Sequence, residues 1–266
     1  GGILSLFIML FFFFDEGGKT FAIGLEPGFG LLDPEVREGT RAVGPLIAIW
    51  FMIFMVPYFM WVREGKTPNT QGGFRQSMAE LKLSLQGMVK RPSLFAFMGA
   101  QMLYRDALNG LYAFGGIYAV LVLGWGQTQL GIFGIISGIS AALVTWISGK
   151  YDRKLGPLPV IYFHIFVLII VSLCIIGMSR SSFYGLGLAE GSTLPDVLFY
   201  VCGAAIGGSG GGIYSASRSM MVRHTNPARP TEAFGLFALA GKATAFLAPL
   251  LIGIFTYWLN DARLGF

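Results

Sequence analysis

The chain has 266 residues, of which 54% are hydrophobic and only 12% are charged, and its mean hydropathy is +0.65. Soluble domains carry roughly 25% charged residues, so this composition excludes an ordinary soluble domain and predicts an all-α polytopic membrane protein. The net charge of +5 does not indicate nucleic-acid binding, because the basic residues gather in particular connections between apolar segments.

The first apolar run covers residues 1–14. A membrane-spanning helix needs about 20 residues, so we expect a truncated first span and a chain that is a fragment of a longer protein. An acidic connection rich in glycine and proline follows over 15–42, and 43–62 is the first full span.

The longest polar connection covers residues 63–92. In its second part, apolar side chains recur at spacings of four and three residues, which is typical of one face of an amphipathic helix. The helix either packs as a linker against the bundle or lies at the membrane surface. The apolar face consists of Phe74, Met78, Leu81, Leu85 and Met88.

The next span, 93–124, is interrupted near its middle by Arg105, Asp106 and Asn109. Charged groups at this depth cost roughly 2.5–3.5 kcal/mol each on insertion scales, so we expect a role for them. Asp106 lies about 100° round the helix from Arg105. One helix face carries a polar row made of Gln101, Arg105, Asn109 and Tyr112.

Further spans are expected over 130–149, 157–178, 195–221 and 231–259, which gives six full spans and one truncated span. The fifth full span holds Gly203, Gly207 and Gly211, spaced by four residues. This spacing predicts close helix packing, although the run of glycines over 207–212 is also compatible with a bend. His164 is expected to be a packed or interfacial histidine.

The basic residues orient the spans. Twelve of the 19 Lys and Arg residues lie in 63–92, 150–156 and 218–230, and five lie in the connections on the other side. By the positive-inside rule, the first three connections are predicted to be cytoplasmic.

The connection 149–156 reads GKYDRKLG and resembles a loop motif of the major facilitator superfamily. In that superfamily the acidic and basic residues of the loop form contacts that stabilise one closed state of a transporter. The resemblance implies this role for Gly149, Asp152 and Arg153. An ordinary basic loop is the other interpretation.

Two longer stretches, 104–119 and 215–251, resemble the branch of that superfamily that contains the fungal vacuolar amino-acid effluxers and their bacterial relatives. Members have twelve spans in two halves. The resemblance implies three parts: the end of the first half-bundle over 1–62, a cytoplasmic linker over 63–92, and the second half-bundle without its last helix over 93–266. The bacterial relatives imply an inner-membrane location.

The resemblance also places the span 93–124 at the central cavity of the transporter. Arg105 is then a candidate contact for an anionic group of a solute. Asp106 is expected either to pair with Lys242, which lies in the last span, or to carry a coupled proton. A purely structural ion pair is the alternative for these residues.

The sequence therefore predicts a secondary active transporter that moves a small polar solute by alternating access in a lipid bilayer. Amino acids as solutes and coupling to protons are implied by the resemblance alone. No enzyme motif or metal-ligand cluster is visible, so we expect no catalysis and no cofactor. The alternative is a transporter-like structural or assembly subunit with neighbouring membrane subunits.

Overall fold

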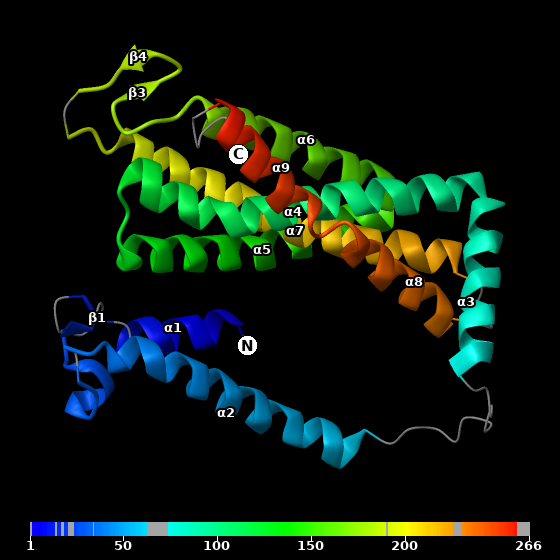
Figure 1. Ribbon diagram of the computed structural model, residues 1–266, viewed down its shortest axis with the longest axis horizontal. Coiled ribbons are helices and arrows are strands. Elements are labelled where there is room, and N and C mark those ends of the chain that lie inside the picture. Colours follow the sequence, from blue (N-terminus) through cyan, green and yellow to red (C-terminus); the bar gives the residue numbers. More distant parts are fainter. Residues whose placement is uncertain are drawn as a thin grey trace. The chain divides into compact units, whose positions relative to one another are not determined.

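The computed structural model describes residues 2–13, 15–16, 19–20, 24–33, 35–62, 74–189, 191–225 and 230–259 (Figure 1). These residues are mostly helical and contain almost no strand, which confirms the all-α fold. In this described part of the chain, six helical segments are long and apolar enough to cross a membrane. They are Glu38–Trp61, Pro92–Leu123, Gln127–Leu155, Pro157–Ile176, Leu194–His224 and Ala233–Leu259.

The chain divides into two compact units. Unit 1 comprises Gly1–Ala79 and Gln127–Ile135, and unit 2 comprises Glu80–Gly126 and Ile136–Phe266. The predicted domain boundaries after residues 62 and 92 stay a prediction.

Unit 1 contains α1 (Gly2–Phe12), α2 (Glu38–Trp61) and a short antiparallel pair of strands, β1 (Asp15–Glu16) and β2 (Lys19–Thr20). A 3-10 turn, η1 (Pro27–Gly30), precedes α2. The beginning of α5 (Gln127–Leu155) also belongs to this unit. There Gly131 and Gly134 lie against Leu10 and Leu6 of α1, so small residues admit the leucines of a neighbouring helix.

The amphipathic segment forms α3 (Phe74–Val89), as its spacing predicted. Met78 and Leu85 of the apolar face are exposed and Met88 is half-buried. The side chains of Phe74 and Leu81, and the residues from 63 to 73, lie outside the described part. Because the described residues of the apolar face are mostly exposed, both interpretations of this helix, at the membrane surface or against the bundle, stay open.

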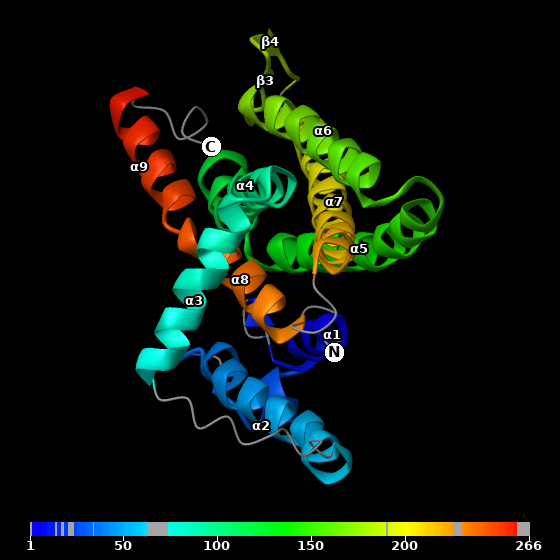
Figure 2. The same ribbon diagram turned by 90° about the vertical axis from the view of Figure 1, so that its right-hand side faces the viewer.

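Unit 2 is a helical bundle built around α4 (Pro92–Leu123) and α7 (Leu194–His224). α6 (Pro157–Ile176) lies alongside α7, and α4 contacts α7, α8 (Pro230–Ala243) and α9 (Leu247–Leu259), as Figures 1 and 2 show. The core lies between α4, α6 and α7, where Leu108, Ile175, Phe199 and Ile213 are inaccessible.

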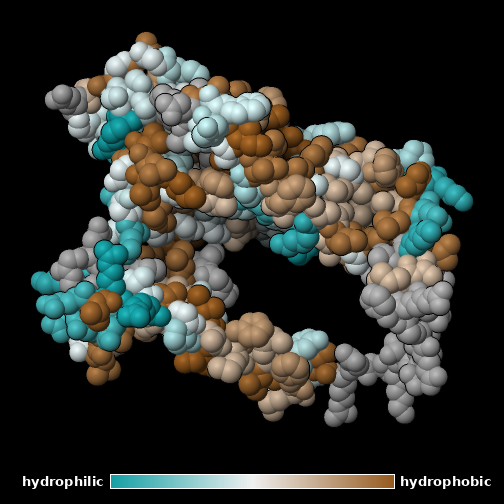
Figure 3. Space-filling model, in the orientation of Figure 1, coloured by the Kyte–Doolittle hydropathy of each residue, from teal (hydrophilic) through white to brown (hydrophobic). Residues whose placement is uncertain are grey.

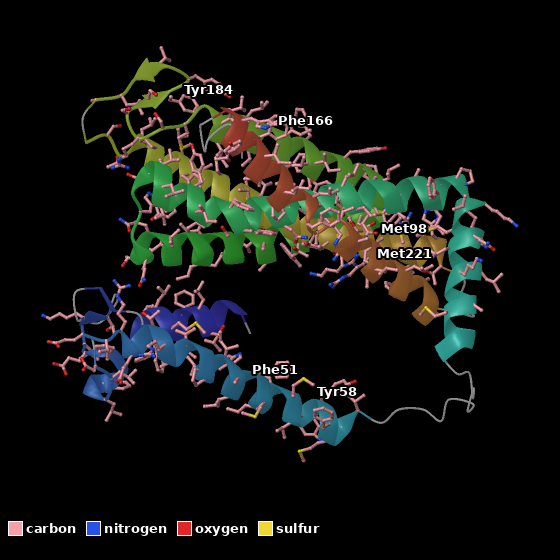
Figure 4. All side chains as sticks on the ribbon, in the orientation of Figure 1. Phe51, Tyr58, Met98, Phe166, Tyr184 and Met221 are labelled. Carbon is pink, nitrogen blue, oxygen red and sulfur yellow. The ribbon has the colours of Figure 1, made fainter. Side chains whose placement is uncertain are left out.

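The outer surface of this bundle is apolar. Figure 3 shows brown and tan along the helices of unit 2, with teal mostly near the loops and helix ends and a small teal area in the middle. Phe166, labelled in Figure 4, is one of several large apolar side chains of α6 that are more than half exposed. Side chains of this kind are suited to contact with lipid rather than water, which supports an integral membrane protein.

Two predicted connections are shorter than expected. α5 continues to Leu155, so the predicted loop 150–156 is helical except for Gly156, whose φ of 88° ends the helix. Lys150–Leu155 contain no glycine or proline, and Gly156 and Pro157 supply the first stop signal. Similarly, α7 continues past the predicted end at Met221 to His224.

The predicted polar loop 179–194 contains a hairpin of β3 (Ser182–Phe183) and β4 (Leu186–Gly187). Tyr184 and Gly185 form its two-residue turn with φ angles of 49° and 80°. Positive φ at both central positions is the pattern of a type I′ turn, whose twist matches that of the strands.

The last predicted span, 231–259, is found as the apolar segment Ala233–Leu259, which is long enough to cross a membrane. It is divided into α8 and α9 by a turn over Thr244, Ala245 and Phe246. Pro249 favours the break, because proline has no N–H to donate to the carbonyl of Ala245, and its ring would clash with that carbonyl in a continuous helix.

Candidate functional site

The polar row predicted from the sequence lies on α4 where this helix meets α7 and α8. Met98 of α4 and Met221 of α7, both labelled in Figure 4, are buried at one end of this region. The row is therefore part of a helix junction, and each of its residues has its own surroundings.

Gln101 is completely buried. Its Nε2 donates a hydrogen bond of 3.1 Å to the carbonyl oxygen of Phe237 on α8, whereas its Oε1 is buried without a partner. The adjacent hydroxyl of Tyr104 lies 2.6 Å from the hydroxyl of Ser217 on α7. Gln101 and Tyr104 therefore join α4 to two neighbouring helices.

Arg105 lies between two aromatic rings. The central carbon of its guanidinium is 5.1 Å from the ring centre of Tyr214 on α7 and 5.4 Å from that of Phe237 on α8. The group also fills the space beside Gly241, where an added Cβ would overlap it. Its Nε is buried without a hydrogen-bond partner.

Asp106 has a different environment. Its Oδ2 accepts a hydrogen bond of 2.9 Å from the backbone N–H of Ala248, at the start of α9. Its Oδ1 is buried and has no hydrogen-bond partner. The break between α8 and α9 frees the first N–H groups of α9, and a carboxylate near a helix N-terminus satisfies such a donor.

Thr244 strengthens the same contact between α4 and the break. Its Oγ1 donates a hydrogen bond of 3.1 Å to the carbonyl oxygen of Met102. Asp106 and Thr244 together hold the turn between α8 and α9 against α4.

The expected ion pair between Asp106 and Lys242 is not formed. Lys242 is exposed on α8, and the ion pairs found among the described side chains are Arg180–Asp196 and Arg223–Asp152. Asp106 instead accepts a hydrogen bond from Ala248 at the break between α8 and α9. This break was not part of the sequence prediction.

Asn109 and Tyr112 complete the row. Asn109 is half-buried and Tyr112 is about half exposed. The hydroxyl of Tyr112 donates a long hydrogen bond of 3.5 Å to the carbonyl oxygen of Ile206 and lies against Gly210, both on α7.

A cavity of about 540 Å³ in unit 2 lies away from this row. It is bounded by α4, α6 and α9, and Tyr104, Ala107, Gly110 and Leu111 are its lining residues from α4. At 100° per residue, Ala107 and Leu111 are on the side of α4 opposite to Arg105 and Asn109. This mostly apolar cavity is therefore separate from the polar row.

The predicted loop motif lies at the end of α5. Asp152 is largely buried and its Oδ1 is 3.8 Å from a guanidinium nitrogen of Arg223 at the end of α7, an ion pair without a hydrogen bond. Arg153 is exposed, and a Cβ at Gly149 would meet no neighbour. The pair links the ends of α5 and α7.

The glycines of α7 admit neighbours on several sides. An added Cβ at Gly207 would overlap the backbone of Ser137 on α5, and one at Gly212 would overlap the ring of His164 on α6. His164 is buried, with its Nε2 2.8 Å from the hydroxyl of Ser148. α7 is unbroken, so the close-packing interpretation holds for these glycines and His164 is a packed residue.

Sequence comparison identifies the family. The profile described as "Vacuole effluxer Atg22 like" matches residues 33–266. The chain belongs to this family. Membership of the Atg22-like family confirms the predicted branch of the major facilitator superfamily.

A curated relative of this Atg22-like chain is an uncharacterized MFS-type transporter, YxiO, from Bacillus subtilis (strain 168). It is 24% identical over 213 residues, which cover 79% of this chain and 45% of that protein. The chain thus spans about half the length of this relative. No solved structure matches.

Sequence reasoning missed the residues that surround the polar row. Tyr214 and Phe237 lie in apolar segments, where nothing in the local pattern distinguishes them from other core aromatics. Pro249 was a visible signal, because a proline well inside a predicted span indicates a break or a kink.

Proposed function

We propose that the protein is a secondary active transporter that moves a small polar solute across a membrane by alternating access. The family and the apolar helices support a membrane transporter. The observation that carries the proposal is the polar row near the middle of α4, in a helix long enough to cross a bilayer. Ionisable residues at this depth are retained chiefly where they bind or couple a solute.

Gln101, Arg105, Asn109 and Tyr112 are the proposed contacts for the solute. Amino acids are the first solutes to test, on the basis of the family resemblance. Asp106 is the proposed site of a coupled proton, since one of its buried oxygens has no hydrogen-bond partner while the other holds α9. Lys242 is exposed near the same break and is proposed to act in coupling.

The connections at 63–92, 150–156 and 218–230 are proposed to face the cytoplasm of a bacterial inner membrane. At that side, Gly149, Asp152 and Arg153 are proposed to stabilise one state of the transport cycle. Asp152 forms an ion pair with Arg223 that joins the ends of α5 and α7 within the proposed second half-bundle, so the loop motif is tied to a neighbouring helix end.

Transport by the native polypeptide in proteoliposomes tests the proposal. Uptake of a radiolabelled amino-acid mixture, with and without a pH gradient, is expected to exceed that of empty liposomes. Arg105→Gln is expected to lower uptake at least tenfold, whereas Lys154→Gln, an exposed basic residue of α5, serves as the matched control.

Asp106→Asn separates coupling from binding. If Asp106 carries the coupled proton, the variant keeps solute exchange but loses accumulation driven by the pH gradient. Equal uptake by the wild type and Arg105→Gln contradicts the proposed site. Absence of uptake, together with co-purifying membrane subunits, favours the assembly-subunit alternative.

A further inference from the structure

The guanidinium of Arg105 occupies a cradle made by three helices. Arg105 comes from α4, the ring of Tyr214 from α7, and the ring of Phe237 and the space at Gly241 from α8. Arginine is suited to such a position, because its planar and weakly hydrated group stacks on aromatic faces. The cradle holds the charge in place without using its hydrogen-bond donors.

This positive charge has no counter-ion among the described residues. Neither of the ion pairs found there involves Arg105. The neighbouring Asp106 is bonded to the N–H of Ala248. Near the middle of an apolar helix, an unpaired charge is unfavourable, and aromatic faces compensate for only part of the lost hydration.

Arg105 is only partly buried, although its Nε is covered. A guanidinium with unused donors is matched in geometry by the two oxygens of a carboxylate or by a phosphate group. A bound anion would supply both the missing charge and the missing acceptors. Within the described residues, these groups are not supplied to Arg105, so a bound anion is needed to neutralise the guanidinium.

We infer that Arg105 is an anion-binding residue, that the solute carries a carboxylate or phosphate group there, and that Tyr214, Phe237 and Gly241 position the guanidinium. This inference rests on the proposed transport function for the identity of the ligand as a solute. The test measures only binding and accessibility. The inference can therefore fail while transport is observed, and it can hold while no transport is observed.

A cysteine at Asn109, one turn from Arg105, reports the local charge. Asn109→Cys in the native polypeptide is treated with an anionic and with a cationic methanethiosulfonate, and the parent protein gives the background from native cysteines. Side chains at this spacing lie about 5–6 Å apart. We expect Arg105→Gln to lower the ratio of anionic to cationic reaction rates about tenfold.

The cradle is tested by two alanine variants of the same helix. A Cβ at Gly241 would displace the guanidinium, whereas one at Gly235 would meet nothing within 4 Å. Gly241→Ala is therefore expected to reduce the rate ratio at least threefold, and Gly235→Ala to leave it unchanged. Tyr214→Phe, which keeps the ring, is expected to preserve the ratio, and Tyr214→Leu to reduce it.

Protection of the same cysteine identifies the anion. Lactate, inorganic phosphate and uncharged lactamide are added separately at equal ionic strength. Slower modification with lactate indicates a carboxylate site, and slower modification with phosphate indicates a phosphate site. The inference is overturned if neither anion protects better than lactamide, if Arg105→Gln leaves the ratio unchanged, or if the cysteine does not react.

Discussion

Two segments of unit 2 contain residues that disfavour helices. One of these segments remains a single helix and the other is divided into two helices. α7 contains the glycine run 207–212 and remains one helix from Leu194 to His224. The segment 230–259 contains a proline at position 249 and is divided into α8 and α9. Glycine and proline therefore have different consequences in helices of the same bundle.

The difference follows from what each residue removes. A glycine costs a helix about 1 kcal/mol relative to alanine, but it keeps its N–H. In α7 the space above the glycines is filled by Ser137, Tyr112 and His164 of three neighbouring helices. Proline removes a donor and adds a clash with the carbonyl four residues earlier. α2 contains Pro45 and Pro57 and remains one helix, so a proline does not by itself divide a helix.

The break between α8 and α9 is instead stabilised by hydrogen bonds to polar groups of another helix. Asp106 accepts from Ala248, and Thr244 donates to Met102 on the same helix, α4. One helix is stabilised by close contact and the other by hydrogen bonds across the break.

The largest effect is expected at the closest contact of α7. Gly207→Ala places a Cβ against the backbone of Ser137, which has no flexible side-chain end to move aside. We expect a loss of about 3 kcal/mol in unfolding free energy. Thermal unfolding in detergent measures it, with Gly115→Ala as control because a Cβ there meets nothing within 4 Å. Equal unfolding temperatures for both variants would contradict close packing at Gly207.

Removal of the carboxylate at the helix break comes next. Asp106→Ala leaves the N–H of Ala248 without its acceptor. The expected loss is about 2 kcal/mol, and Asp106→Asn, which keeps an oxygen, is expected to lose less. Thermal unfolding is again the measurement. An alanine variant as stable as the wild type would show that Asp106 does not stabilise the break.

Pro249→Ala is expected to reduce the contribution of Asp106 to the unfolding free energy. Without the proline, the N–H of Ala248 is able to bond to Thr244 within a continuous helix. A double-mutant cycle with Asp106→Ala should give a coupling of about 1 kcal/mol. Additive effects would mean that the proline is not the cause of the break.

The smallest effect is expected at the ion pair between α5 and α7. Arg223 is more than half exposed and its distance from Asp152 is 3.8 Å. Exposed pairs contribute about 0.2–1 kcal/mol, so Arg223→Gln is expected to change stability by less than about 1 kcal/mol. A larger loss in the same unfolding assay would indicate a structural role beyond the ion pair.

Hydropathy was sufficient to predict the number and order of the spans, because apolar length is the main requirement for crossing a bilayer. It did not give the ends of α5 and α7, because the charged and basic residues in Lys150–Leu155 and Val222–His224 lower the hydropathy there while the helices continue. Helix continuation depends on the absence of stop signals rather than on hydropathy.

The candidate site was predictable only in part. Arg105 and Asp106 were identified because charge is rare in an apolar helix. Their partners were not, since Tyr214, Phe237 and Ala248 are distant in sequence and become neighbours through packing. The predicted ion pair between Asp106 and Lys242 is not formed, because opposite charges in two spans do not determine which side chains meet. The N–H of Ala248 at the helix break offers Asp106 a donor at a fixed position.

The most direct test concerns the two faces of α4. Single cysteines replace Arg105, Asn109 and Tyr112 on the polar face, and Ala107 and Leu111 on the face that lines the apolar cavity. Their rates of reaction with N-ethylmaleimide are measured in the native polypeptide in lipid vesicles, since this reagent requires a hydrated thiolate. We predict reaction at least tenfold faster on the polar face, as expected for a helix that lines a water-filled transport pathway. Equal rates on both faces, or faster reaction at Ala107 and Leu111, would contradict that role for α4.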